Sequence, residues 1–138
     1  MTRRNLSANW SIDLDDSFSG RVVDGDLQLV SPGPPVRTIW LAIWYPPAEQ
    51  GPEELMAKVL REVNPAPLER FEDVGDDEGE LRYASWYPEE VDGRQQWSLY
   101  GYVTRRGVYV QYAFFSDVAS DRDWALTTWR SLRYRPGA

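Results

Sequence analysis

Two stretches of the chain have the length of a β-strand and carry apolar residues on both faces. Successive side chains of a strand point to opposite faces of the sheet. A strand that is apolar on both faces therefore lies inside a sheet that is covered on both sides. Residues 36–45 carry Ile39, Leu41 and Ile43 on one face and Trp40, Ala42 and Trp44 on the other, and residues 107–115 carry Val108, Val110, Tyr112 and Phe114 opposite Tyr109, Ala113 and Phe115.

Shorter patterns surround these two strands. Trp10, Ile12 and Leu14 alternate with polar residues, which predicts a half-buried strand at 10–14. Asp24-Gly25 is a two-residue hairpin signal, and further strands are predicted at 68–74, 80–87 and 95–104. With helices at 52–63 and 121–133, this order predicts a single α+β domain over residues 1–138, with a mostly antiparallel sheet flanked by two helices.

Capping chemistry sets the predicted helix boundaries. Pro52 suits the first helical position, and an Asn-Pro-Ala-Pro segment stops the helix 52–63. Ser120 and Asp123 have the spacing of a capping box at the start of the helix 121–133. The buried side of this second helix is predicted to contain Trp124, Ala125, Leu126, Trp129 and Leu132.

The chain contains no cysteine and no histidine. Disulfides, thiol nucleophiles, cysteine-ligated metals and histidine-dependent catalysis are therefore excluded. The net charge is −7 and the basic residues are scattered, with Arg3-Arg4 and Arg105-Arg106 as the only adjacent pairs. This argues against nucleic acid and anionic membranes as partners. No signal peptide and no run of about 20 apolar residues is present, so we expect a cytoplasmic protein.

The order of the elements resembles the Mog1/PsbP-like fold family. The parts that carry the resemblance are the strand at 10–14, the hairpin at 21–30, the strand at 36–45 and the helix at 52–63 after a Pro-rich turn. Antiparallel strands to Phe115 follow, then a helix at 121–132 that is entered through an Asp-x-x-Trp step and ends on Ser131-Leu132. The family includes a Ran-binding protein, a photosystem II subunit and bacterial effector chaperones. The resemblance implies a bacterial protein with a binding role, because the family shares no catalytic residue set. Many members carry a secretion signal, and this chain departs from them there.

An acidic segment runs from Glu69 to Asp92. It contains ten acidic residues and two arginines, so the rest of the chain is close to neutral. The stretch from Asp73 to Glu80 does not have calcium-ligand spacing, because Gly75 stands at the third position of the loop. We expect a solvated hairpin turn and no metal ligands; a weak cation site and a surface for a basic partner are the alternatives.

Aromatic residues are the candidate binding residues. The tripeptide Trp-Tyr-Pro occurs twice, at 44–46 and at 86–88. One interpretation is that both copies are strand ends where proline stops pairing and the aromatics close the core. The other is that they line a recognition surface on an exposed part of the sheet, since Trp and Tyr anchor interfaces. The candidate set is Trp44, Tyr45, Trp86, Tyr87 and Trp97.

These observations predict a non-enzymatic protein-binding module or adaptor that uses an aromatic sheet surface or the acidic loop. The partner is expected to be another protein, with a homodimer as one form of it, and no cofactor and no catalytic residues are assigned. An alternative is a carrier of a small apolar ligand held between sheet and helix. A hydrolase with a carboxylate pair is a third, weaker alternative, since the spacing of such a pair cannot be read from sequence.

Overall fold

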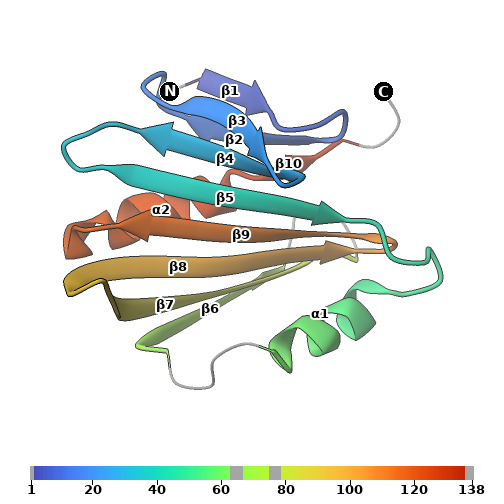
Figure 1. The fold of residues 1–138 in the computed structure, drawn as a ribbon. Coiled ribbons are helices and arrows are strands. Elements are labelled where there is room, and N and C mark those ends of the chain that lie inside the picture. Colours follow the sequence, from blue (N-terminus) through green and yellow to red (C-terminus); the bar gives the residue numbers. More distant parts are fainter. Residues whose placement is uncertain (1, 63–66, 75–78, 136–138) are drawn as a thin grey trace.

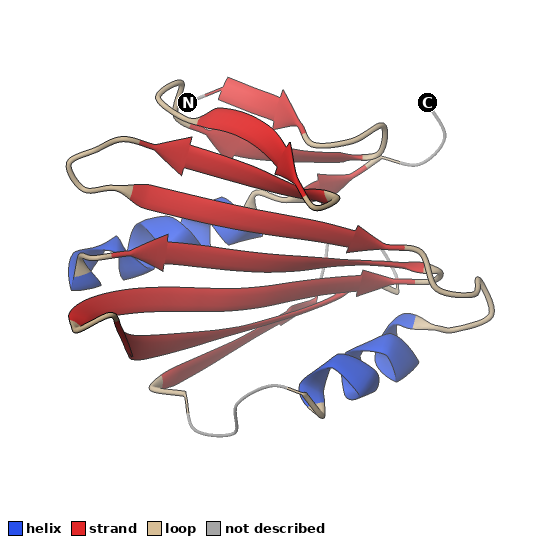
Figure 2. Cartoon of the chain, in the orientation of Figure 1, coloured by secondary structure: helices blue, strands red, loops and turns tan. Residues whose placement is uncertain are grey.

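The computed structural model describes residues 2–62, 67–74 and 79–135, in which ten strands form two antiparallel sheets accompanied by two helices (Figures 1 and 2). This confirms the predicted α+β class. The larger sheet has the order β3-β4-β5-β9-β8-β7-β6 and the smaller one β1-β2-β10. In chain order the elements are β1 (Thr2–Asn5), β2 (Trp10–Leu14), β3 (Ser19–Val23), β4 (Asp26–Ser31), β5 (Arg37–Trp44), α1 (Pro52–Leu60), β6 (Glu69–Val74), β7 (Leu81–Val91), β8 (Arg94–Arg105), β9 (Val108–Ser116), a 3₁₀ turn (Ala119–Asp121), α2 (Arg122–Arg130) and β10 (Arg133–Tyr134).

The two doubly apolar stretches form β5 and β9, and they pair with each other inside the larger sheet. Ile39 lies opposite Phe114, and Trp44 lies opposite Tyr109. β4 flanks β5 on one side and β8 flanks β9 on the other. Both strands are interior, as their sequences predict.

One face of the larger sheet is covered by α2 and by the smaller sheet, and we call it the α2 face. The indole of Trp129 lies directly on Gly101 of β8, where an added Cβ would be 2.6 Å from Nε1. β2 contributes its alternating apolar residues to the same core. The core cluster includes Trp10, Ile12, Leu14, Ile39, Leu41, Trp86, Leu99, Val103, Val110, Phe114 and Trp129.

The opposite face, which we call the α1 face, carries α1 at one end. Thr104 of β8 lies on the face opposite to Gly101, because their positions differ by an odd number, and its hydroxyl donates to the backbone oxygen of Pro52 at 3.0 Å. Leu55 and Met56 are the buried apolar residues of α1 that follow this anchor. Figure 1 shows α1 at the end of the sheet where β5 ends, while α2 lies behind β5 and β9.

Turn chemistry follows the sequence at both Asp-Gly pairs. Asp24 and Gly25 connect β3 to β4, and Asp92 and Gly93 connect β7 to β8, all four with positive φ. A two-residue turn of this kind matches the twist of the flanking strands. The Asp-Gly hairpin prediction is confirmed.

Pro88 does not end its strand, contrary to the prediction for the second Trp-Tyr-Pro copy. β7 continues to Val91, and Pro88 lies opposite Trp97. Val91 and Arg94 flank the two-residue turn and form a hydrogen-bonded pair, so the backbone nitrogens of even-numbered β7 residues point toward β6. β6 begins at Glu69, opposite Trp86, and so does not reach Pro88. The missing N–H of Pro88 therefore costs no ladder hydrogen bond.

The predicted capping box at α2 is wrong. Asp121 is the N-cap residue, its side chain makes no capping hydrogen bond, and Ser120 belongs to the preceding 3₁₀ turn. The carboxylate of Asp121 instead accepts hydrogen bonds from Arg37 at 2.8 and 3.0 Å and from the Ser116 hydroxyl at 2.6 Å. An ion pair to β5 has replaced the local cap. The two helices are also shorter than predicted, ending at Leu60 and Arg130.

Candidate binding groove on the α1 face

A groove of about 320 Å³ lies between α1 and the ends of β5 and β9. Trp44 and Tyr109 are directly opposite each other on these strands, and their rings lie 6.1 Å apart at an interplanar angle of 18°. The two rings form one wall, and α1 forms the other. The lining residues are Trp44, Tyr45, Pro46, Leu55, Lys58, Val59, Glu62 and Tyr109.

Two aromatic side chains at the groove are open to solvent. Trp44 is 49% exposed and Tyr45 is 68% exposed. Their exposure is explained by where β5 ends. Trp44 is the last residue of the strand, and Pro46 lies just beyond it. A large aromatic residue that stays exposed beside a concave surface is suited to contact a partner.

The charges at the groove come from α1 and the turn after it. Lys58 and Glu62 both line the groove and both are exposed. Burial is the main cause that raises the pKa of Tyr109 above its ordinary value, and the negative charge of Glu62 adds to it. Burial also raises the pKa of Tyr102, with Tyr87 and Glu62 adding to the effect. Both phenols therefore remain protonated hydrogen-bond donors at neutral pH.

The five predicted site residues do not form one surface. Trp86 is 3% exposed and Tyr87 is 5% exposed, so of the two interpretations the one that places them on an exposed recognition surface is wrong. Trp86 stacks on Trp97 at 5.7 Å on the α2 face, and Trp97 is partly buried against the core. Of the five, only Trp44 and Tyr45 line the groove.

The physical reason is the position of each tripeptide in its strand. Trp44 ends β5, whereas Trp86 lies in the middle of β7 opposite Leu99. At the Trp44 end of the sheet the register runs through Tyr109 and Thr104 to Leu81. Trp86 is five residues further along β7, about 17 Å at the usual rise per strand residue. β5 and β7 are both interior strands of the larger sheet, but β4 pairs with β5 only as far as Leu41 and β6 pairs with β7 only as far as Trp86.

A second polar group on the α1 face was missed by sequence reasoning. Glu89 of β7 accepts hydrogen bonds from the Ser98 hydroxyl at 2.8 Å and from the Tyr100 hydroxyl at 3.0 Å. Burial, with the neighbouring Glu89 charge, raises the pKa of Tyr100 to about 12. In the sequence, Glu89 is only one of the residues of the acidic segment. Its spacing of two from Tyr87 along β7 places both side chains on the same face of the sheet.

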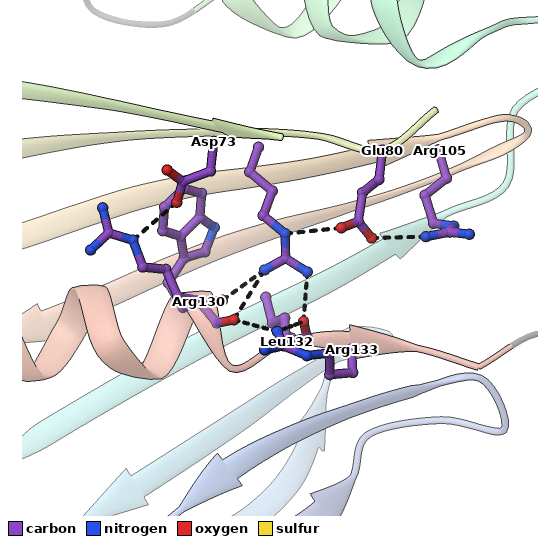
Figure 3. Close-up of polar contacts among 8 residues, drawn as sticks. Asp73, Glu80, Arg105, Arg130, Leu132 and Arg133 are labelled. Atoms are coloured by element: carbon purple, nitrogen blue, oxygen red, sulfur yellow. Dashed lines mark hydrogen bonds and ion pairs between the residues drawn. The ribbon is translucent and has the colours of Figure 1, made fainter. Parts of the chain in front are cut away.

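The acidic segment is only partly solvated, which corrects that expectation. Glu80 is 3% exposed and forms ion pairs with Arg82 at 3.1 Å and Arg105 at 3.0 Å (Figure 3). Asp73 pairs with Arg130 of α2 at 3.0 Å, and Glu69 pairs with Arg122. Asp76, Asp77 and Glu78 lie outside the described residues.

Arg82 connects this ion-pair cluster to the C-terminal end of α2. Its guanidinium donates to the backbone oxygens of Trp129 at 3.3 Å, Arg130 at 3.4 Å and Leu132 at 2.6 Å. The last carbonyls of a helix have no partner within the helix, and a buried cation there satisfies them. The cluster thus fixes α2 on the sheet.

Asp121 is held as a carboxylate by its surroundings. Burial by itself raises the pKa of Asp121, but the hydrogen bonds from Arg37 and Ser116 and the Arg37 charge outweigh it and lower the pKa below its ordinary value. Across residues 2–62, 67–74 and 79–135, no group of three or more Asp or Glu residues could hold a metal ion. No helix in the same ranges is long and apolar enough to cross a membrane.

No family model and no curated protein matches the chain. Among solved structures, a crystal structure from Bacteroides thetaiotaomicron VPI-5482 superposes with a TM-score of 0.66 at 10% sequence identity. The match covers 91% of this chain and 45% of the other, so this chain spans less than half of that protein's length. The likeness at this identity shows the arrangement of strands and helices.

Proposed function

We propose that this chain is a protein-binding module and that the groove between α1 and β5 is its contact surface. The observation that carries the proposal is the exposure of Trp44 and Tyr45 beside a concave wall of the molecule. Trp and Tyr supply large contact areas at small entropic cost and are enriched among residues that dominate binding energies. The partner segment would place an apolar side chain between the Trp44–Tyr109 wall and α1.

Charge favours a basic partner. The chain has a net charge of −7, which attracts positively charged proteins during encounter. At the groove itself, Lys58 and Glu62 have opposite signs, so they select the orientation of a partner segment more than its overall charge. We further propose that the resemblance to Mog1/PsbP-like proteins reflects a shared binding role, and that the protein works in the cytoplasm.

One observation favours a second candidate, the carrier of a small apolar ligand. The groove lies between sheet and helix, and its volume of about 320 Å³ is at the lower end of the range for ligand sites. Its two exposed aromatics leave much of any occupant in contact with solvent, and this favours a protein segment over an enclosed ligand.

The test compares a groove variant with a matched control in the native cell. Trp44→Ala combined with Tyr45→Ala removes both exposed rings, and Val91→Ala removes an exposed apolar side chain at the hairpin end of β7. Proteins captured by the wild type and the control but lost with the groove variant are identified, purified and titrated. We expect the groove variant to bind the purified partner about thirtyfold more weakly, the equivalent of about 2 kcal/mol.

A partner that binds the wild type and the groove variant equally contradicts the proposal. A small molecule that remains on the native protein in mass spectrometry, and is lost with the same double substitution, supports the carrier instead.

A further inference from the structure

The two edges of the larger sheet differ in chemistry. β6 forms one edge and carries Glu69, Arg70, Glu72 and Asp73 in six residues. Charges of this density on an edge discourage pairing with another chain. β3 forms the other edge, with the sequence Ser-Gly-Arg-Val-Val and a single charge. The charges of β6 therefore protect that edge against pairing with another strand, whereas β3 has little such protection.

Hairpin geometry shows which backbone groups of β3 point outward. Val23 and Asp26 flank the Asp24-Gly25 turn and form a hydrogen-bonded pair. The pattern alternates along an antiparallel ladder, so Ser19, Arg21 and Val23 bond to β4. The N–H and C=O groups of Gly20 and Val22 point away from the sheet. Within the described residues these outward groups have no hydrogen-bond partner.

The preceding outward group is already occupied. The guanidinium of Arg4 donates to the backbone oxygen of Phe18 at 2.8 Å. A side chain thus takes the place of a neighbouring strand at Phe18, and the row of open groups begins at Gly20. An added strand would gain up to four backbone hydrogen bonds, two at each open residue.

The side chains of β3 indicate what such a strand would carry. Val22 is 73% exposed, the highest value among the large apolar residues that the structure describes. Arg21 lies on the other side of the strand and donates to the neutral side chain of Gln28 at 2.6 Å. No described carboxylate lies within ion-pair distance of Arg21. The complementary strand therefore has an apolar residue beside Val22 and an acidic residue beside Arg21.

We infer that β3 is a docking edge for an extended segment of another protein, in which an acidic residue lies opposite Arg21 between two apolar ones. A second copy of the chain fits less well. In the self-pairing register that uses all four open groups, Gly20 lies opposite Val22 of the other copy, and the two Arg21 side chains lie directly opposite each other. Like charges in that position are destabilising. This edge is separate from the groove and does not depend on its function.

The experiment uses two capped synthetic peptides, Thr-Val-Glu-Val-Thr and Thr-Val-Lys-Val-Thr, titrated into the full chain and followed by amide NMR. We expect the Glu peptide to shift the amide signals of Gly20 and Val22 and to bind about five- to tenfold more tightly than the Lys peptide. Val22→Pro removes one outward N–H without touching the ladder to β4 and should weaken binding about tenfold, whereas Val22→Thr retains the N–H and most of the binding.

Charge reversal keeps the inference testable even where Val22→Pro alters the fold. Arg21→Glu should reverse the preference, so that the Lys peptide binds more tightly. Equal binding of both peptides to the wild type overturns the assigned partner chemistry. Signal shifts away from β3, or no binding by either peptide, overturn the docking edge. Concentration-dependent dimerisation that Val22→Pro abolishes assigns the edge to a second copy and overturns the proposed partner.

Discussion

The two faces of the larger sheet come from the same strands, yet they differ in how fully they are covered. On the α2 face, Ile39, Val103 and Phe114 are fully buried. On the α1 face, their strand neighbours Trp40, Tyr102 and Phe115 are only partly buried, and Trp44 is half exposed. Both faces are rich in large apolar side chains, and only one has a complete second layer.

The difference lies in what each helix brings. α2 buries Ala125, Leu126 and Trp129 and shares its core with β2. α1 buries Leu55 and Met56, and it covers only one end of the α1 face of the sheet. Elsewhere on the α1 face, aromatic rings cover one another, as in the edge-to-face contacts of Tyr100 with Tyr87 and with Phe115. We therefore expect the α2 face to supply most of the stability, while the α1 face keeps more apolar surface in contact with solvent.

The strongest test of this contrast truncates one aromatic residue on each face. Trp129→Ala removes a fully buried indole and should lower the free energy of unfolding by about 3–5 kcal/mol. Tyr45→Ala, at a 68% exposed residue, should change it by less than about 0.5 kcal/mol. Urea unfolding of both variants gives the comparison. Equal losses would show that the two faces share the stability evenly.

A smaller effect is expected from adding a methyl group beneath α2. In Gly101→Ala the new Cβ would lie 2.6 Å from Nε1 and 2.7 Å from Cδ1 of Trp129, and the rigid ring cannot move without lifting α2. We expect a loss of about 3 kcal/mol. Gly20→Ala is the control, because the atom nearest to its new Cβ is the end of the Leu29 side chain at 3.0 Å, and the next two lie at 3.7 and 3.9 Å. Thermal unfolding that is equally affected by both variants would contradict the close seating of α2.

The ion pair that replaces the helix cap is expected to contribute about 2 kcal/mol. The pKa of Asp121 is lowered in the folded protein, so its stabilisation is present above the unfolded pKa and is lost as the pH falls through the folded value. Asp121→Asn should therefore be less stable than the wild type at neutral pH, and the difference should shrink as the pH falls through the lowered pKa of Asp121. Urea unfolding at neutral pH and over a series of acidic pH values measures this. A constant difference between the two proteins would be the contrary result.

The smallest effect concerns the groove. Glu62 contributes to the raised pKa of Tyr109, second to burial. Glu62→Gln removes the charge and should lower the pKa of Tyr109 while leaving it above its ordinary value, because burial remains. Ultraviolet titration of the wild type and the variant, each compared with its Tyr109→Phe counterpart, isolates this phenol. An unchanged pKa would separate Glu62 from the Trp44–Tyr109 wall.

Local signals in the sequence predicted much of the fold. Alternation identified the strand at Trp10–Leu14, Asp24-Gly25 identified a hairpin, and double apolarity identified β5 and β9 as interior. β1 and β10 were not predicted, because they pair with β2 from opposite ends of the chain and have little pattern of their own. Of the candidate site residues taken from the sequence, Trp44 and Tyr45 line the groove, whereas Trp86 and Tyr87 are buried.

The sequence by itself determined which side chains share a face, because the two-residue period of a strand is a local property of the backbone. It could not determine which face would be covered. That depended on Trp129 reaching Gly101 and on Asp121 reaching Arg37, contacts between residues far apart in the chain. The burial of a residue depends on what packs against it. The same tripeptide therefore places Trp44 in the wall of the groove and Trp86 in the core.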